Sequence, residues 1–217
     1  MSDIFTEVDE EVRRERARQL WARYGSLLIA IAVIAVVAVG GWRGYQWYEA
    51  KQTAAAGALF DAATDLADQG KGAEAETAFS KVAAEGAGGY RTLAKLRLAA
   101  TAAERDPKAG VAAYDAVVGD ASAGKVFQEF AGVRAGMLLV DTATLPEMIR
   151  RLEPLAQAGG AFRHSARELL ALAAVKASDT AAAKKWFDMV LGDAETPQSV
   201  RTRIDMLMTL NGTTSNG

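Results

Sequence analysis

One stretch limits what this chain can fold into more than any other. Residues 24–42, YGSLLIAIAVIAVVAVGGW, carry no charge between Arg23 and Arg43. At roughly 1.5 Å per residue, a helix of this length extends about 28 Å, which matches the roughly 30 Å hydrocarbon core of a bilayer. Amphipathic aromatic rings favour headgroup depth, and such rings stand at both ends of the stretch: Trp21, Tyr24, Trp42, Tyr45 and Trp47. We therefore predict a transmembrane helix over 24–42, embedded in a lipid bilayer, with these five residues at its interfaces.

Basic residues predict the orientation of this helix, because lysine and arginine next to a span resist translocation. Five arginines precede it, whereas only Arg43 and Lys51 closely follow it. The arginines are Arg13, Arg14, Arg16, Arg18 and Arg23. We expect residues 1–23 to form a cytoplasmic helix, with a capping box at Thr6 and Asp9, and everything from Arg43 onward to lie across the membrane.

Two other interpretations of the stretch are less favourable. Ala38, Val39 and Gly40 offer small residues for a signal peptidase, but the apolar run is longer than a signal core and follows an extended charged segment. A buried core helix would not explain apolar residues on every face together with aromatic rings at both ends.

Composition favours a helical domain after the span. Alanine, the best helix former and a poor strand residue, is the commonest residue of the chain. Cysteine is absent, which excludes disulfides and thiol chemistry. Positive and negative residues are balanced and interspersed, so no basic stripe indicates nucleic acid as a partner.

A repeat of about 35 residues follows. Large apolar residues head similar motifs at Phe79, Tyr114, Leu152 and Phe187, each with a companion three residues later and a small or flexible residue four earlier. Glycine-containing breaks and a second apolar-periodic helix follow each motif. Asp106 and Thr196, each before a proline, and Thr144 with Glu147 predict helix caps. This pattern is typical of tetratricopeptide arrays, in which each helix pair buries its apolar face on the next. We predict an all-α protein: one N-terminal transmembrane helix, a tetratricopeptide-like solenoid over 43–210 and a disordered tail over 211–217.

The juxtamembrane run Gly41-Trp42-Arg43-Gly44-Tyr45, with Trp47, the charged N-terminal helix and the degenerate repeats, resembles the YfgM-like ancillary subunits of the SecYEG translocon. The resemblance implies a bacterial inner-membrane protein with its repeat domain in the periplasm. The implied partners are the SecYEG channel, a membrane-anchored periplasmic chaperone and newly translocated proteins. The repeats lack the early tryptophan and regular terminal proline of strong tetratricopeptide repeats.

The sequence offers little for catalysis. His164 is the only histidine, which excludes a two-histidine metal site, and we expect it to be an ordinary helix residue. The glycines at 86–89 lack the lysine of a phosphate-binding loop. We therefore expect neither an enzyme nor a bound cofactor or metal, which disfavours an anchored hydrolase.

Second helices line the concave side of tetratricopeptide arrays, and several basic or aromatic residues fall on them. We predict a partner groove at Arg91, Arg97, Phe127, Arg134 and Arg163. The arginines either bind acidic groups of a partner or occupy ordinary solvated positions. Two functions remain open: a protein-binding module at the exit side of the Sec translocon, or an envelope-assembly scaffold that dimerises through its span, where Gly40 and Gly44 form a GxxxG pair.

Overall fold

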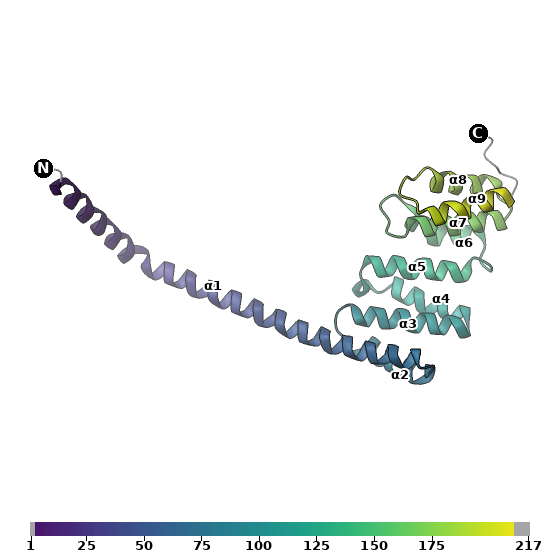
Figure 1. Ribbon diagram of the computed structural model, residues 1–217, viewed down its shortest axis with the longest axis horizontal. Coiled ribbons are helices and arrows are strands. Elements are labelled where there is room, and N and C mark those ends of the chain that lie inside the picture. Colours follow the sequence, from purple (N-terminus) through teal and green to yellow (C-terminus); the bar gives the residue numbers. More distant parts are fainter. Residues whose placement is uncertain (1–2, 211–217) are drawn as a thin grey trace. The chain divides into compact units, whose positions relative to one another are not determined.

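The computed structural model describes the backbone of residues 3–210 and the side chains of 14, 15, 18, 19 and 21–210. The chain divides into two compact units, Met1–Gln52 and Thr53–Gly217. All elements of the described residues are helical (Figure 1): α1 (Asp3–Asp68), α2 (Gly72–Glu85), α3 (Gly89–Arg105), α4 (Pro107–Val118), η1 (Ala121–Ala123), α5 (Lys125–Leu139), α6 (Leu145–Leu152), η2 (Glu153–Ala156), α7 (Arg163–Lys176), α8 (Thr180–Leu191) and α9 (Gln198–Leu210).

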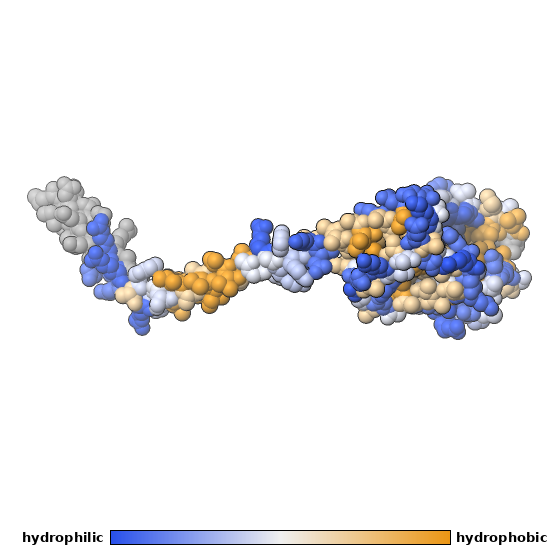
Figure 2. Space-filling model, turned by 90° about the horizontal axis from the view of Figure 1, so that it is seen from below, coloured by the Kyte–Doolittle hydropathy of each residue, from blue (hydrophilic) through white to orange (hydrophobic). Residues whose placement is uncertain are grey.

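The first unit is helix throughout its described backbone. One helical stretch, Trp21–Asp68, is long and apolar enough to cross a membrane by length and composition. Figure 2 shows its apolar part as a band between two hydrophilic stretches. The five predicted interface aromatics have exposed side chains. The capping box predicted at Thr6 and Asp9 and the tail predicted at 211–217 lie outside the described residues.

The second unit stacks helix pairs in two layers. Helices α3, α5, α7 and α9 contact one another in series along one layer, and α4, α6 and α8 each pack against their chain neighbours from the other (Figure 1). Residues 53–68 of α1 join the first pair through an apolar cluster with α2 and α3. Within it, Phe60 lies edge-on to Phe79, with 5.3 Å between ring centroids.

The repeat motifs mark the first helix of each pair. Phe79, Tyr114, Leu152 and Phe187 are all buried, on α2, α4, α6 and α8 respectively. Of their companions three residues later, only Leu155 is partly exposed. It lies on η2 because α6 ends at Leu152, two residues before Pro154, which restricts the preceding residue and cannot donate to a helix.

Three helix caps were predicted in the second unit, and the structure confirms the side-chain bond of one of them. The Asp106 carboxylate accepts a bond from the Lys108 backbone N–H at 2.9 Å at the start of α4. Thr144 precedes α6 but makes no side-chain cap bond. The Thr196 hydroxyl donates to the Val190 carbonyl at 2.7 Å, because it is buried against the end of α8 rather than free to cap α9. Thr144 thus occupies the predicted N-cap position, but the side-chain cap bonds predicted at Thr144 and Thr196 are wrong.

Candidate functional site

A cavity of about 390 Å³ opens on the layer formed by the end of α1, α3 and α5. Its walls are aromatic and aliphatic except for two guanidinium groups. The lining residues are Phe60, Leu93, Leu96, Arg97, Ala100, Tyr114, Phe130 and Arg134. We call this cavity the arginine groove.

Helical spacing explains how each wall is built. Leu93 and Arg97 are four residues apart on α3, and Phe130 and Arg134 are four apart on α5, so each helix presents one apolar and one cationic side chain to the same face. Because α3 and α5 are neighbours in one layer, the two pairs meet in the groove. The buried Tyr114 ring of α4 forms its floor between them.

The two arginines of the groove lack acidic partners. The Arg134 Nε donates to the Tyr114 hydroxyl at 3.4 Å, and its guanidinium also contacts the Met137 sulfur. Arg97 is exposed, and no hydrogen bond or ion pair engages its guanidinium within the part of the chain that the structure describes. No carboxylate lines the groove. Two cations over an apolar floor therefore remain available to an external anionic group.

The other three predicted groove residues lie elsewhere. The Arg91 Nε donates to the Gly86 carbonyl at 3.1 Å and so supports the turn between α2 and α3. Phe127 is partly buried against the cluster around Tyr114. Arg163 pairs with Asp193 at 2.9 Å and also with Glu195. The structure thus brings Arg97 and Arg134 together and places the other three outside the groove lining.

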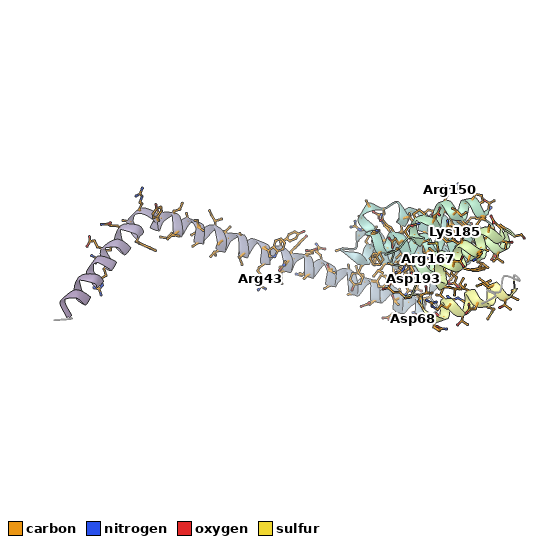
Figure 3. The ribbon with its side chains drawn as sticks, turned by 90° about the horizontal axis from the view of Figure 1, so that it is seen from above. Arg43, Asp68, Arg150, Arg167, Lys185 and Asp193 are labelled. Atoms are coloured by element: carbon orange, nitrogen blue, oxygen red, sulfur yellow. The ribbon has the colours of Figure 1, made fainter. Side chains whose placement is uncertain are left out.

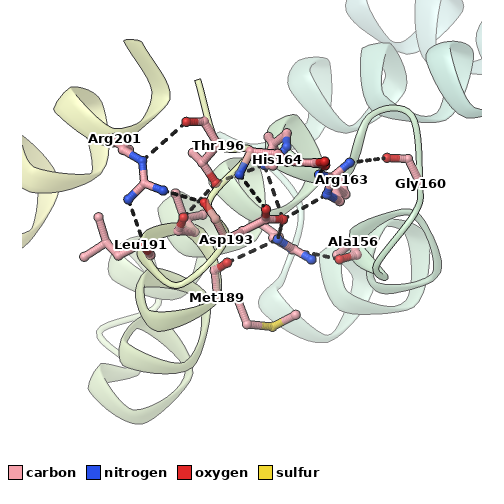
Figure 4. Close-up of polar contacts among 12 residues, drawn as sticks. Ala156, Gly160, Arg163, His164, Met189, Leu191, Asp193, Thr196 and Arg201 are labelled. Atoms are coloured by element: carbon pink, nitrogen blue, oxygen red, sulfur yellow. Dashed lines mark hydrogen bonds and ion pairs between the residues drawn. The ribbon is translucent and has the colours of Figure 1, made fainter. Parts of the chain in front are cut away.

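Arg163 belongs to a polar network centred on Asp193, in the loop between α8 and α9 (Figure 4). The Asp193 carboxylate also accepts from the buried Arg167 at 2.8 Å, and these two residues lie side by side in Figure 3. Arg167 donates further to the Ala156 carbonyl at 2.8 Å and to the Met189 carbonyl at 3.1 Å. Hydrogen bonds from Arg163 and Arg167 hold the pKa of Asp193 well below its ordinary value. The network fixes the loop onto α7.

His164 lies at the edge of this network. Its Nδ1 is 3.1 Å from the Thr196 hydroxyl, which donates to the Val190 carbonyl. Since that hydroxyl proton is engaged, the Nδ1 position carries a proton and donates to Thr196. Burial lowers the pKa of His164, and the neighbouring Arg163 adds to this effect. The imidazole thus takes part in loop packing, and the Thr196 hydroxyl beside it already donates its proton to the Val190 carbonyl.

Six of the eight residues that line the groove were not among the predicted site residues, and Phe60 and Phe130 are two of them. Phe60 comes from the end of α1, which lies within the predicted solenoid range of 43–210 but before the first repeat motif at Phe79. Phe130 marks the second helix of its repeat, and its spacing of four residues from Arg134 is the signal that identifies it. Among the residues that the structure describes, no cluster of histidine and acidic side chains could hold a metal ion.

Comparison with protein families gives a match over most of the chain. The model of the family described as tetratricopeptide repeat-like domain matches residues 18–209, which include the apolar part of α1 and all the helix pairs. No curated protein and no solved structure matches the chain significantly.

Proposed function

Because this chain belongs to the tetratricopeptide repeat-like family, we propose that it is a non-catalytic protein-binding module that uses the arginine groove. The observation that carries the proposal is the pair of guanidinium groups, Arg97 and Arg134, set over an apolar floor without a carboxylate of the chain. Arginine binds carboxylates through a planar fork of donors, and apolar walls reward burial of partner side chains. Such a groove suits a segment of another protein better than a small polar substrate.

We further propose that α1 tethers this module to a membrane. The apolar stretch 24–42 supplies the span, and the exposed rings of Trp21, Tyr24, Trp42, Tyr45 and Trp47 supply interfacial anchors. The excess of arginine before the span orients residues 1–23 toward the cytoplasm and 43–210 toward the periplasm.

The resemblance to YfgM-like subunits narrows the setting of this module. In this proposal the span associates with the SecYEG translocon in a bacterial inner membrane, and the helix pairs act at its exit side with a membrane-anchored periplasmic chaperone on newly translocated proteins. In this proposal the span localises the module at the channel, and the groove recognises the partner protein.

A second function rests on one observation in the span. Cβ atoms added at Gly40 and Gly44 would meet nothing within 4 Å in the monomer, so these two positions leave room for a close helix neighbour. An envelope-assembly scaffold that dimerises through α1, without a tie to the translocon, would use this space.

Site-specific crosslinking in the full chain tests the leading proposal. A photoreactive residue replaces Ala100, which lines the groove, and in a matched variant it replaces Ala116, which is exposed on α4 in the other layer. We expect adducts with periplasmic protein from Ala100 and not from Ala116. Equal adducts from both positions, or none from Ala100, would refute the groove as a protein-binding site.

Exchange of residues 24–42 for an unrelated apolar helix separates the two functions. We expect the exchanged chain to keep its groove adducts and to lose co-purification with the channel. If the exchanged chain still co-purified with the channel at full yield, the translocon assignment would be refuted. If the exchange abolished only self-association of the chain, the dimerising scaffold would be favoured.

A further inference from the structure

A second cavity continues the arginine groove along α3. It has a volume of about 340 Å³ and lies between the end of α1, the start of α2 and the second half of α3. Arg97 and Ala100 line both cavities. The α3 residues that line one or both cavities include Leu93, Arg97, Ala100 and Glu104, whose spacings of four, three and four residues keep them on one helical face. Because they share Arg97 and Ala100, the two cavities adjoin, and in this subsection we treat the arginine groove and the second cavity together as one extended groove.

The charges of this groove differ at its two ends. The first cavity carries only Arg97 and Arg134, whereas the second adds the carboxylates of Asp68, Glu76 and Glu104. Glu76 is neutralised by Arg105, whose guanidinium lies 2.7 Å away. Asp68 and Glu104 are exposed, and within the described part of the chain no hydrogen bond or ion pair engages either carboxylate. One end is thus cationic and the other anionic, with apolar surface between them.

We propose that the groove binds a charge-segregated peptide segment of a partner protein: acidic side chains at the Arg97 and Arg134 end, apolar side chains in the middle and basic side chains at the Asp68 and Glu104 end. The proposal rests on the groove's being the protein-binding site and adds the chemistry and polarity of the occupant. The strip from Leu93 to Glu104 extends about 16 Å along the helix, which about five residues of extended chain span. The recognised motif is correspondingly short.

Charge complementarity favours this occupant over others. A uniformly acidic segment would meet Asp68 and Glu104, and a uniformly basic one would meet Arg97 and Arg134, so each gains at one end and is repelled at the other. A segment with both charges segregated gains at both ends. Purely apolar segments leave all four charges without a partner.

The test uses two capped fluorescent heptapeptides of identical composition, containing lysine, leucine, phenylalanine and glutamate. One carries its lysines at one end and its glutamates at the other, and its isomer interleaves them. Binding to the full chain in detergent micelles is measured by fluorescence anisotropy. We expect the segregated peptide to bind about tenfold more tightly than the isomer. Because the net charge is the same, non-specific attraction does not distinguish the two.

Charge reversal in the groove provides a second test, in which one pair of substitutions lowers the affinity for the peptide and a further pair restores it. Arg97→Glu with Arg134→Glu makes both ends acidic and lowers affinity for the segregated peptide about tenfold. Adding Asp68→Lys and Glu104→Lys exchanges the two ends, and because the free peptide can turn round, affinity returns. Both lysines fall in the last turn of a helix, where the dipole favours a cation. Arg150→Glu, an exposed reversal on α6 far from Asp68 in Figure 3, is the matched control and leaves binding unchanged.

Three results would overturn the inference. The proposed charge segregation would be refuted if the two isomers bound with equal affinity, if neither bound, or if the fourfold variant recovered no affinity. The proposed function has its own criterion, since the Ala100 crosslinks report on protein binding whatever the charge pattern of the bound segment.

Discussion

The contact between α3 and α4 depends on Gly110, and replacing it with alanine is a direct test of the helix-pair packing. A Cβ at this position would lie 2.4 Å from the Ala103 Cβ, 2.6 Å from its Cα and 2.9 Å from its backbone nitrogen. Carbon atoms prefer about 3.5–4.0 Å, and backbone atoms cannot rotate away, so the two helices have to separate. Such overpacking costs up to about 3 kcal/mol, and the better helix propensity of alanine returns about 1 kcal/mol.

We therefore expect Gly110→Ala to lower the free energy of unfolding by about 2 kcal/mol, with a fall in Tm of about 4–8 °C for a chain of this size. Thermal unfolding of the full chain in micelles, followed by far-UV circular dichroism, measures it. The matched control is Gly119→Ala at the end of α4, where the Cβ meets the Asp115 carbonyl oxygen at 3.6 Å and φ is −79°. That variant keeps or slightly raises Tm.

A double variant tests whether the lost stability comes from the contact between positions 103 and 110. Ala103→Gly in the Gly110→Ala background removes the partner at 2.4 Å but leaves the Cα at 2.6 Å. It should recover less than half of the lost stability. If Gly110→Ala proves as stable as Gly119→Ala, the close approach of α3 and α4 is refuted.

Three further predictions concern the second unit. Phe79→Ala removes a buried ring that also packs on Phe60, and it should cost about 3–5 kcal/mol in denaturant unfolding; a cost below about 0.5 kcal/mol would contradict the buried role of the repeat motif. Ser178→Gly should stabilise the chain by about 1 kcal/mol, because Ser178 has φ of 56° in the turn after α7, and a lower Tm would contradict this. The pKa of His164 is lower in the folded chain, so protonation favours the unfolded chain: the contribution of His164 to stability is complete above about pH 6.5 and falls as the pH drops below it. His164→Gln should abolish this fall in a series of Tm measurements at different pH values. An unchanged fall would contradict its assignment to His164.

Helix pairing could be predicted from the sequence because its signals are local. A large apolar residue with a small one four positions earlier marks a buried helical face, and Phe79, Tyr114 and Phe187 lie where this rule puts them. Local signals fail where packing decides the outcome. Thr196 has the residue type and position of a cap, but tertiary contacts bury its hydroxyl against Val190.

The groove could be predicted only in part for the same reason. Arg97 and Arg163 occupy similar positions in the repeat pattern, since each falls on the second helix of a pair. What separates them is Asp193, which is 30 residues from Arg163 in the chain and 2.9 Å from it in space. No spacing rule reports that ion pair, because the loop that carries Asp193 is positioned by the buried Arg167 and the carbonyl groups it holds. Phe60 was not predicted as a groove residue because it precedes the first repeat motif at Phe79, so the spacing of about 35 residues does not identify it.

The proposed tether and the bipolar groove make sense together energetically. Exposed charge pairs each contribute about 0.2–1 kcal/mol, and ordering a flexible segment opposes binding, so a groove of this kind binds weakly in free solution. Salt weakens binding further, because exposed ion pairs are screened by mobile ions, with a Debye length of about 8 Å at physiological ionic strength. Confinement beside a partner raises the effective concentration of the groove, which can raise the apparent affinity by a factor of about 10²–10⁴ without a new contact. A weak, oriented groove on a membrane anchor can therefore select a charge pattern and still release the segment quickly, because its contacts are few and its selectivity comes from repulsion of the wrong pattern.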